Sequence, residues 1–343
     1  ILAHIGTGGR GIEVAPYFNP TLRKFDGYDI VTADVFDTEA LRANAQADTG
    51  IGRDCIAKIE PVDLVGDASA IAETVGARGE LGQFDYIISS HNFEHLPNPI
   101  RFLQGAAQVL REGGVLSMAV PDCRTTFDFY RMPTRLSDWL DAFHEGRAQP
   151  SPGTILDQSL HVSRHTRLGV EYGTASPGVD DPLAFEPSQA FDTSVQDYEA
   201  RKGDPNPPYT DVHCSVFFGE TLELMLRDLR RMGLIGFEII EITPSHGHEF
   251  FVHLRHAPGP DPTPDTVFFD RRAALMRAIA DGLGAPGFRA MGAAHAEAPL
   301  SVRMTQTRKR LERAAQRGLR NLVGAERFIA LDRWWLEKVM RRR

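Results

Sequence analysis

The residues best suited to chemistry in this sequence lie in one short polar run. The run follows the apolar residues 86–88 and consists of Ser89, Ser90, His91, Asn92, Glu94 and His95. In an open parallel sheet, ligands bind at the carboxyl ends of the strands. A histidine that is neutral near pH 7 can accept a proton there from a substrate hydroxyl. The run therefore predicts a site at a strand end, with His91 as the candidate proton acceptor.

His91, Glu94 and His95 also spell H-x-x-E-H, the inverted form of a zinc-protease motif. That motif needs a helix that places both histidines on one face. Here an apolar strand precedes the motif and Pro97 follows it. We therefore expect no metal at this motif, and we expect Glu94 and His95 to fix the loop and the start of the next helix.

Strands and helices alternate around the polar run. We predict strands over 1–5, 28–34, 61–65, 86–90 and 115–120, and helices over 38–47, 69–75 and 99–111. Because the sequence opens inside an apparent strand, we expect an incomplete amino terminus. The alternation indicates an α/β fold with a Rossmann-like, doubly wound parallel sheet. Several strands are near-continuous apolar runs, as strands buried on both faces are.

The middle of the chain has a different composition. Residues 123–218 are rich in Pro, Gly, Asp and His and show little periodicity, except for a short helical pattern at 138–144. The segment 150–208 in particular predicts loop. We interpret 123–218 as a loop-rich insertion that forms a lid over the strand ends and contacts the substrate.

Regular patterns return after the insertion. A helix is predicted over 220–232, and two strands over 236–243 and 249–256 are joined by a turn short enough for an antiparallel pair. Residues 257–300 predict a linker followed by weak helices. Residues 301–343 predict a basic amphipathic helical tail, which completes a helical C-terminal extension.

The segment FDYIISSHNFEHLPNP followed by VLREGGVLSMAVPD resembles the class I S-adenosylmethionine (SAM)-dependent methyltransferases, most closely the small-molecule and glycan-associated type. Sheets of that family end in one reversed strand, which the run 220–256 matches. The resemblance implies a SAM-binding core made of residues 1–122 and 219–256. It also implies a sheet that is mostly parallel with one reversed terminal strand.

The same resemblance implies where SAM would bind. Gly6, Gly8 and Gly11 would border its methionine part and ribose, and Asp34 would accept the ribose hydroxyls, with Asp37 as the neighbouring alternative. The remaining cofactor-binding candidates are Asp67 and Ala68 at the adenine and Ser90 at the end of the fourth strand. His4 stands two positions before the first glycine, where the family often has an acidic residue.

The acceptor side is expected to combine the polar run with the insertion. The resemblance places His91 beside the reactive methyl group, and His213 and Asp128 beside the acceptor. It implies transfer to a small or carbohydrate-like acceptor, at oxygen. The polar insertion residues would bind a polyhydroxyl acceptor or a divalent metal, or they form a salt-bridged lid without a ligand.

Two other functions fit parts of the sequence. One is a non-catalytic methyltransferase-like scaffold in glycan assembly. The other is a nicotinamide-dependent oxidoreductase, because glycines followed by an acidic residue also suit NAD.

Composition limits the partners. The net charge of -8 argues against a general nucleic-acid binder. Three scattered cysteines suggest neither a disulfide framework nor a cysteine-rich zinc site, and indicate a reducing, cytoplasmic location. No apolar run has the length of a membrane span. From Arg303 to Arg343 there are thirteen Lys and Arg against four Asp and Glu, which suggests contact of the tail with a membrane surface or a glycosyltransferase.

Overall fold

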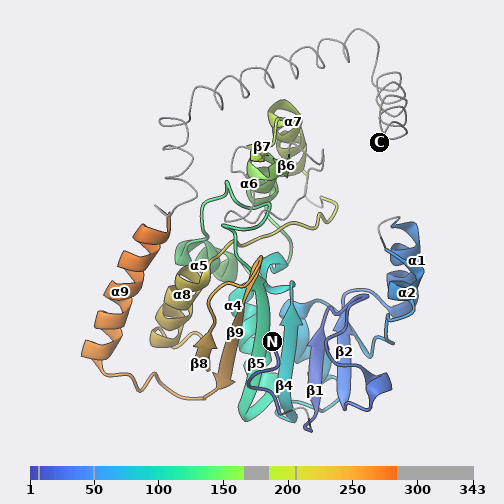
Figure 1. The fold of residues 1–343 in the computed structure, drawn as a ribbon, viewed down its shortest axis with the longest axis vertical. Helices are drawn as coiled ribbons and strands as arrows, with labels where there is room; N and C mark the ends of the chain where they lie inside the picture. The colour runs from blue at the N-terminus through green and yellow to red at the C-terminus, as the bar shows by residue number, and fades with distance from the viewer. Residues whose placement is uncertain (7, 49–50, 166–184, 205–206, 284–343) are drawn as a thin grey trace, which may run out of the picture. The chain divides into compact units, whose positions relative to one another are not determined.

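A seven-stranded sheet forms the centre of the structure (Figure 1). The computed structural model describes residues 1–6, 8–48, 51–165, 185–204 and 207–283. The strands are β1 Gly11–Val14, β2 Ile30–Asp34, β3 Leu64–Val65, β4 Phe84–Ser90, β5 Leu110–Pro121, β8 Phe237–Ile242 and β9 Glu249–His256. Their order is β3-β2-β1-β4-β5-β9-β8, and β9 is antiparallel to both of its neighbours. The predicted Rossmann-like sheet with a reversed last strand is confirmed.

Helices connect these strands at positions that the sequence marks. They are α1 Thr38–Ala47, α2 Arg53–Ile56, α3 Ile71–Gly76, α4 Pro99–Val109, α8 Gly219–Arg231 and α9 Asp265–Leu283, with short 3-10 turns η1 Lys24–Asp26, η2 Ala68–Ala70 and η3 Phe93–His95. The carboxylate of Asp37 accepts the Ala40 N–H at 2.8 Å and so caps α1. Asn98 caps α4 in the same way, and Pro99 occupies its first turn.

The two faces of the sheet bury different clusters. On β4, Ile87 belongs to the main core, together with α4 residues such as Phe102 and Leu103. Tyr86 and Ile88 point to the other face, as successive residues of a strand do. On that face the apolar residues of segment 1–5 pack against Tyr86 and Ile88. The predicted strand 1–5 is therefore wrong, because its side chains cover the sheet without joining it.

The predicted glycine loop is also misplaced. β1 begins at Gly11, so Gly6 and Gly8 precede the first strand and lie toward its amino end. A Cβ atom on Gly11 would come within 2.0 Å of the Tyr86 ring, so a glycine is needed here for close packing. Gly6, Gly8 and Gly11 therefore cannot form the turn after the first strand that was predicted to border a cofactor.

The insertion 123–218 contains more regular structure than its composition suggested. It holds α5 Leu136–His144, α6 Pro152–His161, α7 Phe191–Lys202 and a two-stranded antiparallel sheet of β6 Ser163–His165 and β7 Phe185–Pro187. Among the described residues of 150–208 the expectation of mostly loop is thus wrong, whereas the helix near 138–144 is confirmed. The Trp139 indole donates to the Ser215 hydroxyl at 2.9 Å, and Asn98 donates to the Ala142 carbonyl at 3.3 Å. These bonds tie α5 to the segment before α8 and to the start of α4.

After the sheet the chain forms one long helix. α9 lies against α8 through ion pairs of Arg271 with Glu223 and of Arg272 with Asp228. It is 19 residues long, so the expectation of weak helices over 257–300 underestimates its first part. The remainder, with the predicted tail 301–343, lies outside the described residues. Among the described residues, none of the helices combines the length and apolar character needed to cross a membrane.

Candidate active site

A cavity of about 430 Å³ lies where the parallel strands end. Its wall is formed by residues that follow four neighbouring strands: Ala15 after β1, Asp34 at the end of β2, Asp67 and Ala68 after β3, and Asn92 and His95 after β4. Ala148, Gln149 and Tyr209 of the insertion complete the wall. The position at the carboxyl edge is the one where sheets of this kind bind ligands.

A larger hollow of about 970 Å³ lies elsewhere, between the insertion and helices α8 and α9. Met132, Leu224 and Ile279 are part of its lining. No end of a parallel strand contributes to this lining within the described part of the chain. The smaller cavity is therefore the candidate cofactor site, because only it combines strand ends with carboxylates.

Asp34 stands where a nucleotide-binding sheet needs an acid. Its side chain is buried, and one carboxylate oxygen accepts the Phe36 N–H at 3.0 Å. Burial raises the pKa of Asp34 above its ordinary value, although backbone hydrogen bonds oppose this. A carboxylate at the end of the second strand can accept both hydroxyls of a ribose.

Asp67 both caps a turn and lines the cavity. Its carboxylate accepts the Ser69 N–H at 2.7 Å and caps the turn η2. It also lines the cavity, as does Ala68. Ser90, by contrast, pairs with Ala119 on β5 and is not among the cavity residues.

The end of β1 and the turn after it reach the cavity through Val14 and Ala15, which the sequence prediction missed. Glu13 is buried, and its carboxylate accepts the N–H groups of Thr21 at 2.6 Å and Leu22 at 3.2 Å. Ala15 and Tyr17 adopt left-handed backbone angles, with φ of 50° and 44°. Such angles are costly for residues other than glycine and are concentrated at functional sites.

Glu13 also corrects the interpretation of His4. With β1 in its true position, Glu13 is the acidic residue two positions before the turn, where Ala15 replaces a glycine. His4 instead pairs with Glu241 at 2.8 Å. An acid between two β-branched residues, in Ile12-Glu13-Val14 followed by Ala15-Pro16, is the signal that would have located this strand.

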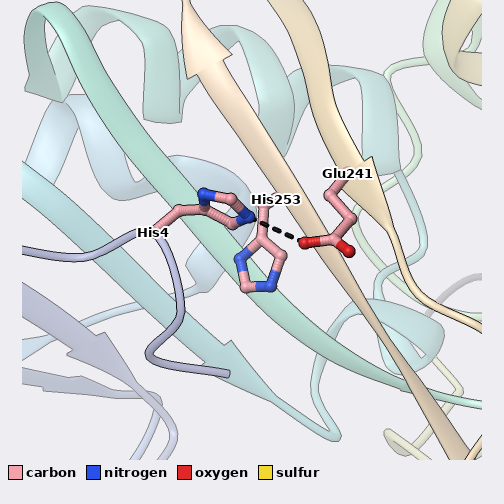
Figure 2. Close-up of side chains that lie close together, drawn as sticks. All are labelled: His4, Glu241 and His253. Carbon is pink, nitrogen blue, oxygen red and sulfur yellow. Dashed lines mark hydrogen bonds and ion pairs between the residues drawn. The ribbon is translucent and has the colours of Figure 1, made fainter.

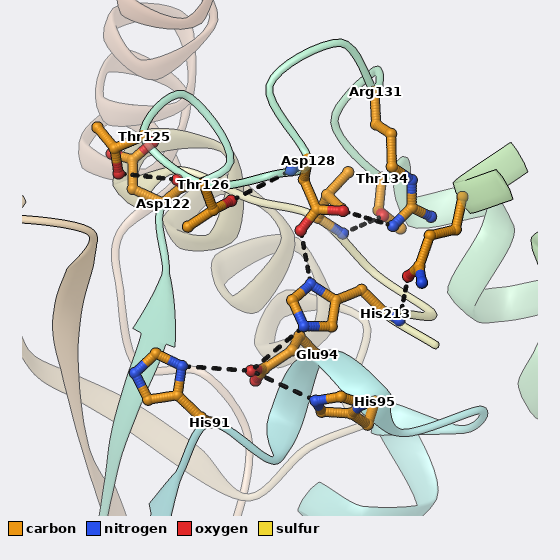
Figure 3. A network of polar contacts seen from close by, with 12 residues as sticks. His91, Glu94, His95, Asp122, Thr125, Thr126, Asp128, Arg131, Thr134 and His213 are labelled. Carbon is orange, nitrogen blue, oxygen red and sulfur yellow. Dashed lines mark hydrogen bonds and ion pairs between the residues drawn. The ribbon is translucent and has the colours of Figure 1, made fainter. Parts of the chain in front are cut away.

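Beside the cavity, Glu94 lies at the centre of three imidazole rings (Figure 3). Its oxygen Oε1 is 3.6 Å from His91 Nδ1, 3.8 Å from His95 Nε2 and 3.9 Å from His213 Nε2. Glu94 is fully buried, and neither of its carboxylate oxygens has a hydrogen-bond partner among the described residues. We call His91, Glu94, His95 and His213 the histidine cluster.

Asp128 and Arg131 of the insertion orient His213. The distance from His213 Nδ1 to Asp128 Oδ2 is 2.5 Å, and Arg131 Nη1 donates to the other oxygen of Asp128 at 2.8 Å. Asp128, Arg131 and His213 are all buried. Burial by itself would raise the pKa of Asp128, but His213 and Arg131 hold it below its ordinary value.

The other two imidazoles are held in the same manner. His95 Nδ1 lies 2.9 Å from Asp211 Oδ1, and His91 Nε2 lies 2.7 Å from Glu249 Oε2. Each ring therefore binds a carboxylate with one nitrogen and directs the other nitrogen toward Glu94. His91 does so from a left-handed conformation with φ of 48°.

Electrostatics changes the expectation for His91. Its hydrogen bond to Glu249 and its contact with Glu94 raise the pKa of His91 to about 10. The ring therefore carries a proton at neutral pH, which disfavours the predicted neutral base. Burial would raise the pKa of Glu94, yet the three surrounding histidines keep it below its ordinary value, so Glu94 is a carboxylate.

The three residues predicted to be catalytic lie together. His91 follows β4, whereas Asp128 and His213 lie near the two ends of the insertion, and Glu94 lies between the two histidines. Glu94 and His95 do more than fix the loop, since they form the middle of the cluster. His95 also lines the cavity, so the cluster and the cofactor site share a wall.

Comparison with known proteins identifies the class. Residues 5–159 match a family described as a methyltransferase domain. This part of the chain is a methyltransferase domain of the SAM-dependent class. No curated protein matches it. The family match and the reversed β9 argue against the nicotinamide-dependent oxidoreductase. Neither finding supports the non-catalytic scaffold.

Solved structures similar to the methyltransferase are distant from it. The CurJ carbon methyltransferase is 14% identical, with a TM-score of 0.34, over 74% of this chain and 50% of that chain. A SAM-dependent methyltransferase from Aquifex aeolicus is 12% identical, with a TM-score of 0.35, over 73% and 83%. One from Mesorhizobium loti is 14% identical, with a TM-score of 0.34, over 72% and 91%. This chain therefore spans half the length of the CurJ carbon methyltransferase. The fold is defined by the order of the strands in the sheet and not by these similarities.

The cavity suits the cofactor of this methyltransferase. Its volume of about 430 Å³ falls within the range of about 300–1,000 Å³ that is usual for small-molecule sites. Asp34 and Asp67 supply acceptors at two strand ends, as the hydroxyls and amino group of a nucleoside require. SAM supplies an activated methyl group, so the protein mainly has to align the acceptor with it.

Proposed function

We propose that this methyltransferase methylates a hydroxyl oxygen of a small polyhydroxyl acceptor, such as a carbohydrate. The observation that supports this most is the histidine cluster beside the cavity, with His95 belonging to both. A hydroxyl is a weak nucleophile until its proton is withdrawn, and imidazoles and carboxylates are the side chains that assist this. An acceptor between the cavity and the cluster would have both the methyl donor and these groups within reach.

The cofactor contacts follow from the cavity wall. We infer that Asp34 accepts the ribose hydroxyls and that Asp67 accepts the adenine amino group, with Ala68 against the ring. The strained turn at Ala15 would bring backbone N–H groups close to the ligand, in place of the glycines predicted earlier. These assignments rest on the position of each residue at a strand end.

The acceptor contacts follow from the cluster. His213, oriented by Asp128, would face the acceptor hydroxyl, and His91 would lie beside the methyl group at the end of β4. The insertion adds polar groups, including the Tyr209 hydroxyl, which lies 3.4 Å from Asp211. A carbohydrate has several hydroxyls that such groups can bind.

Binding of SAM by an Asp34→Asn variant tests the cofactor assignment. Hydrogen bonds to charged groups contribute about 1.5–3 kcal/mol, so we expect SAM affinity to fall about 10- to 100-fold in calorimetry. Asp37→Asn is the matched control, because Asp37 caps α1 and asparagine caps helices equally well. Equal SAM affinity in Asp34→Asn and the unmodified protein would contradict the role of Asp34.

A screen with isotope-labelled SAM tests the acceptor class. The panel would contain free sugars, nucleotide sugars, amines and carbon acids, and NMR would identify the methylated atom. We expect a methyl ether on a sugar. Transfer only to nitrogen or carbon would refute O-methylation while leaving the SAM site intact.

A further inference from the structure

We propose that the histidine cluster is a binding site for a divalent transition-metal ion, zinc being the ion that suits its donors best. Glu94, His95 and His213 would be the ligands, which leaves a fourth position of a tetrahedral ion open. Metal binding itself does not depend on the proposed function, and only the effect of the ion on the acceptor rests on it. The inference reverses the sequence-based expectation that the H-x-x-E-H motif binds no metal.

The strongest support is the buried carboxylate at the centre. Glu94 is fully buried, and both of its oxygens lack hydrogen-bond partners in the described structure. Native proteins rarely leave a buried charge without hydrogen bonds, because desolvation is costly. The nearest imidazole nitrogens are 3.6–3.9 Å away, too far for hydrogen bonds. Metal-binding nitrogen and oxygen atoms therefore face one another at the centre of the cluster without hydrogen bonds between them.

The spacing of these donors suits a metal ion. Tetrahedral zinc, with bonds of about 2.0–2.1 Å, separates its ligand atoms by about 3.4 Å. The distances from Glu94 Oε1 to the three imidazole nitrogens are 3.6, 3.8 and 3.9 Å. The ligand atoms of Glu94, His95 and His213 all lie within 4.8 Å of one another. The distances from Glu94 to His95 and His213 exceed the tetrahedral separation by only about 0.4–0.5 Å.

The outer contacts are those of metal-binding histidines. A metal-bound histidine almost always donates its second ring N–H to a carboxylate or carbonyl. His213 meets Asp128 at 2.5 Å, and His95 meets Asp211 at 2.9 Å. His91 meets Glu249 at 2.7 Å. Two imidazoles with carboxylates behind them, together with Glu94, give the three protein ligands that a catalytic zinc site has.

The location suggests what the ion does. His95 lines the cofactor cavity, so an ion at the cluster lies next to the cavity wall. Neighbouring hydroxyls of a carbohydrate can bind an open coordination position, as substrates do at catalytic metal sites. The ion would therefore fix the acceptor hydroxyl close to the methyl donor.

Metal analysis of the purified full chain tests the proposal. The protein is stripped with a chelator, incubated with Zn²⁺, dialysed and measured by mass spectrometry for bound metal. We expect one equivalent in the unmodified protein and less than a tenth of that in Glu94→Gln, which keeps the side-chain volume. His4→Ala is the matched control, because His4 belongs to another group of two histidines and a glutamate. It should keep the full equivalent.

A second measurement protects the test against misfolding of Glu94→Gln. Cobalt bound to the unmodified protein should give the visible absorption bands of a tetrahedral ion with nitrogen and oxygen ligands. Absence of bound zinc and of these bands in the unmodified protein would overturn the proposal, and would mean that protons on the imidazoles balance Glu94. Loss of the metal in His4→Ala but not in Glu94→Gln would also overturn it.

The outcome is independent of the cofactor assignment. Asp34→Asn should lose affinity for SAM and keep its metal, whereas Glu94→Gln should keep its affinity for SAM and lose its metal. A failure of the metal proposal is therefore distinguishable from a failure of the proposed function.

Discussion

Of the three groups of histidines and glutamates among the described residues, two differ most in their surroundings. One is the histidine cluster around Glu94. The other, which we call the surface cluster, consists of His4, Glu241 and His253 (Figure 2). In the surface cluster His4 Nε2 lies 2.8 Å from Glu241 Oε2, and the His4 and His253 rings meet edge-on with centroids 4.7 Å apart.

The difference lies in whether the carboxylate is already paired. Glu241 reaches solvent and its charge is balanced by a close contact with His4, with 47% of the glutamate side chain exposed. Glu94 is buried, and three imidazoles surround it without reaching hydrogen-bond distance. Residue types alone therefore do not mark a metal site. The feature that indicates a metal site is a buried carboxylate that faces several imidazoles without a hydrogen bond to any of them.

The largest expected contrast is in catalysis. Glu94→Gln should reduce methyl transfer about a thousandfold, because acid–base and metal assistance to a hydroxyl contributes about 10²–10⁴-fold. Glu241→Gln makes the same chemical change in the surface cluster and should leave transfer unchanged. Turnover of the acceptor found in the screen gives both values.

Binding of SAM is the control for this contrast. Both variants should bind SAM with unchanged affinity, since neither glutamate lines the cavity. If Glu94→Gln and Glu241→Gln methylate the acceptor equally fast, the histidine cluster has no role in the reaction.

Most of the sheet could be predicted because its strands are apolar and its turns carry clear signals. The residues of β9 and of α1 were predicted without error, although the cap of α1 is Asp37 and not Thr38. β1 was missed because it has four residues, of which Gly11 has no side chain and Glu13 is charged. Segment 1–5 resembled a strand because its apolar side chains also cover the sheet.

The candidate site was only partly predictable, for a related reason. Asp34 and Asp67 follow strands, so their place in the cavity could be derived from strand order. The H-x-x-E-H motif was set aside because it does not lie on a regular helix. Its third histidine partner, His213, comes from a distant segment that the insertion brings back to β4. A contact between segments so far apart in the chain leaves no local pattern in the sequence.

The next contrast concerns stability in acid. His253 is buried, and burial together with the charge of His4 lowers the pKa of His253 to about 4, although Glu241 opposes this. The unfolded chain takes up this proton at about pH 6.5, so it binds more protons than the folded protein between these values. Stability should be highest above this range and fall, by at most about 3 kcal/mol, as the pH drops to about 4.

Urea unfolding across this pH range measures the effect. His253→Gln should lack this part of the pH dependence, because glutamine does not titrate. His4→Ala should weaken it by removing a nearby positive charge. A His253→Gln variant with the same pH dependence as the unmodified protein would show that other groups cause it.

The smallest contrast concerns the outer partners of the imidazoles. Asp211 binds His95 Nδ1 in the histidine cluster, and Ser117 Oγ binds His253 Nδ1 at 2.9 Å in the surface cluster. Loss of such an outer carboxylate typically lowers metal affinity about 10- to 100-fold, so Asp211→Ala should show this decrease in a competition assay with a chelating dye. Asp211→Asn should lose less, because its amide oxygen still accepts the His95 N–H. Ser117→Ala should not change zinc affinity at all.

Asp211 has 67% of its side chain exposed and so contributes little to the core. A decrease confined to Asp211→Ala would therefore reflect the loss of support for the His95 ligand and not a change in the fold. Equal zinc affinity in all three variants would mean that His95 is not a ligand.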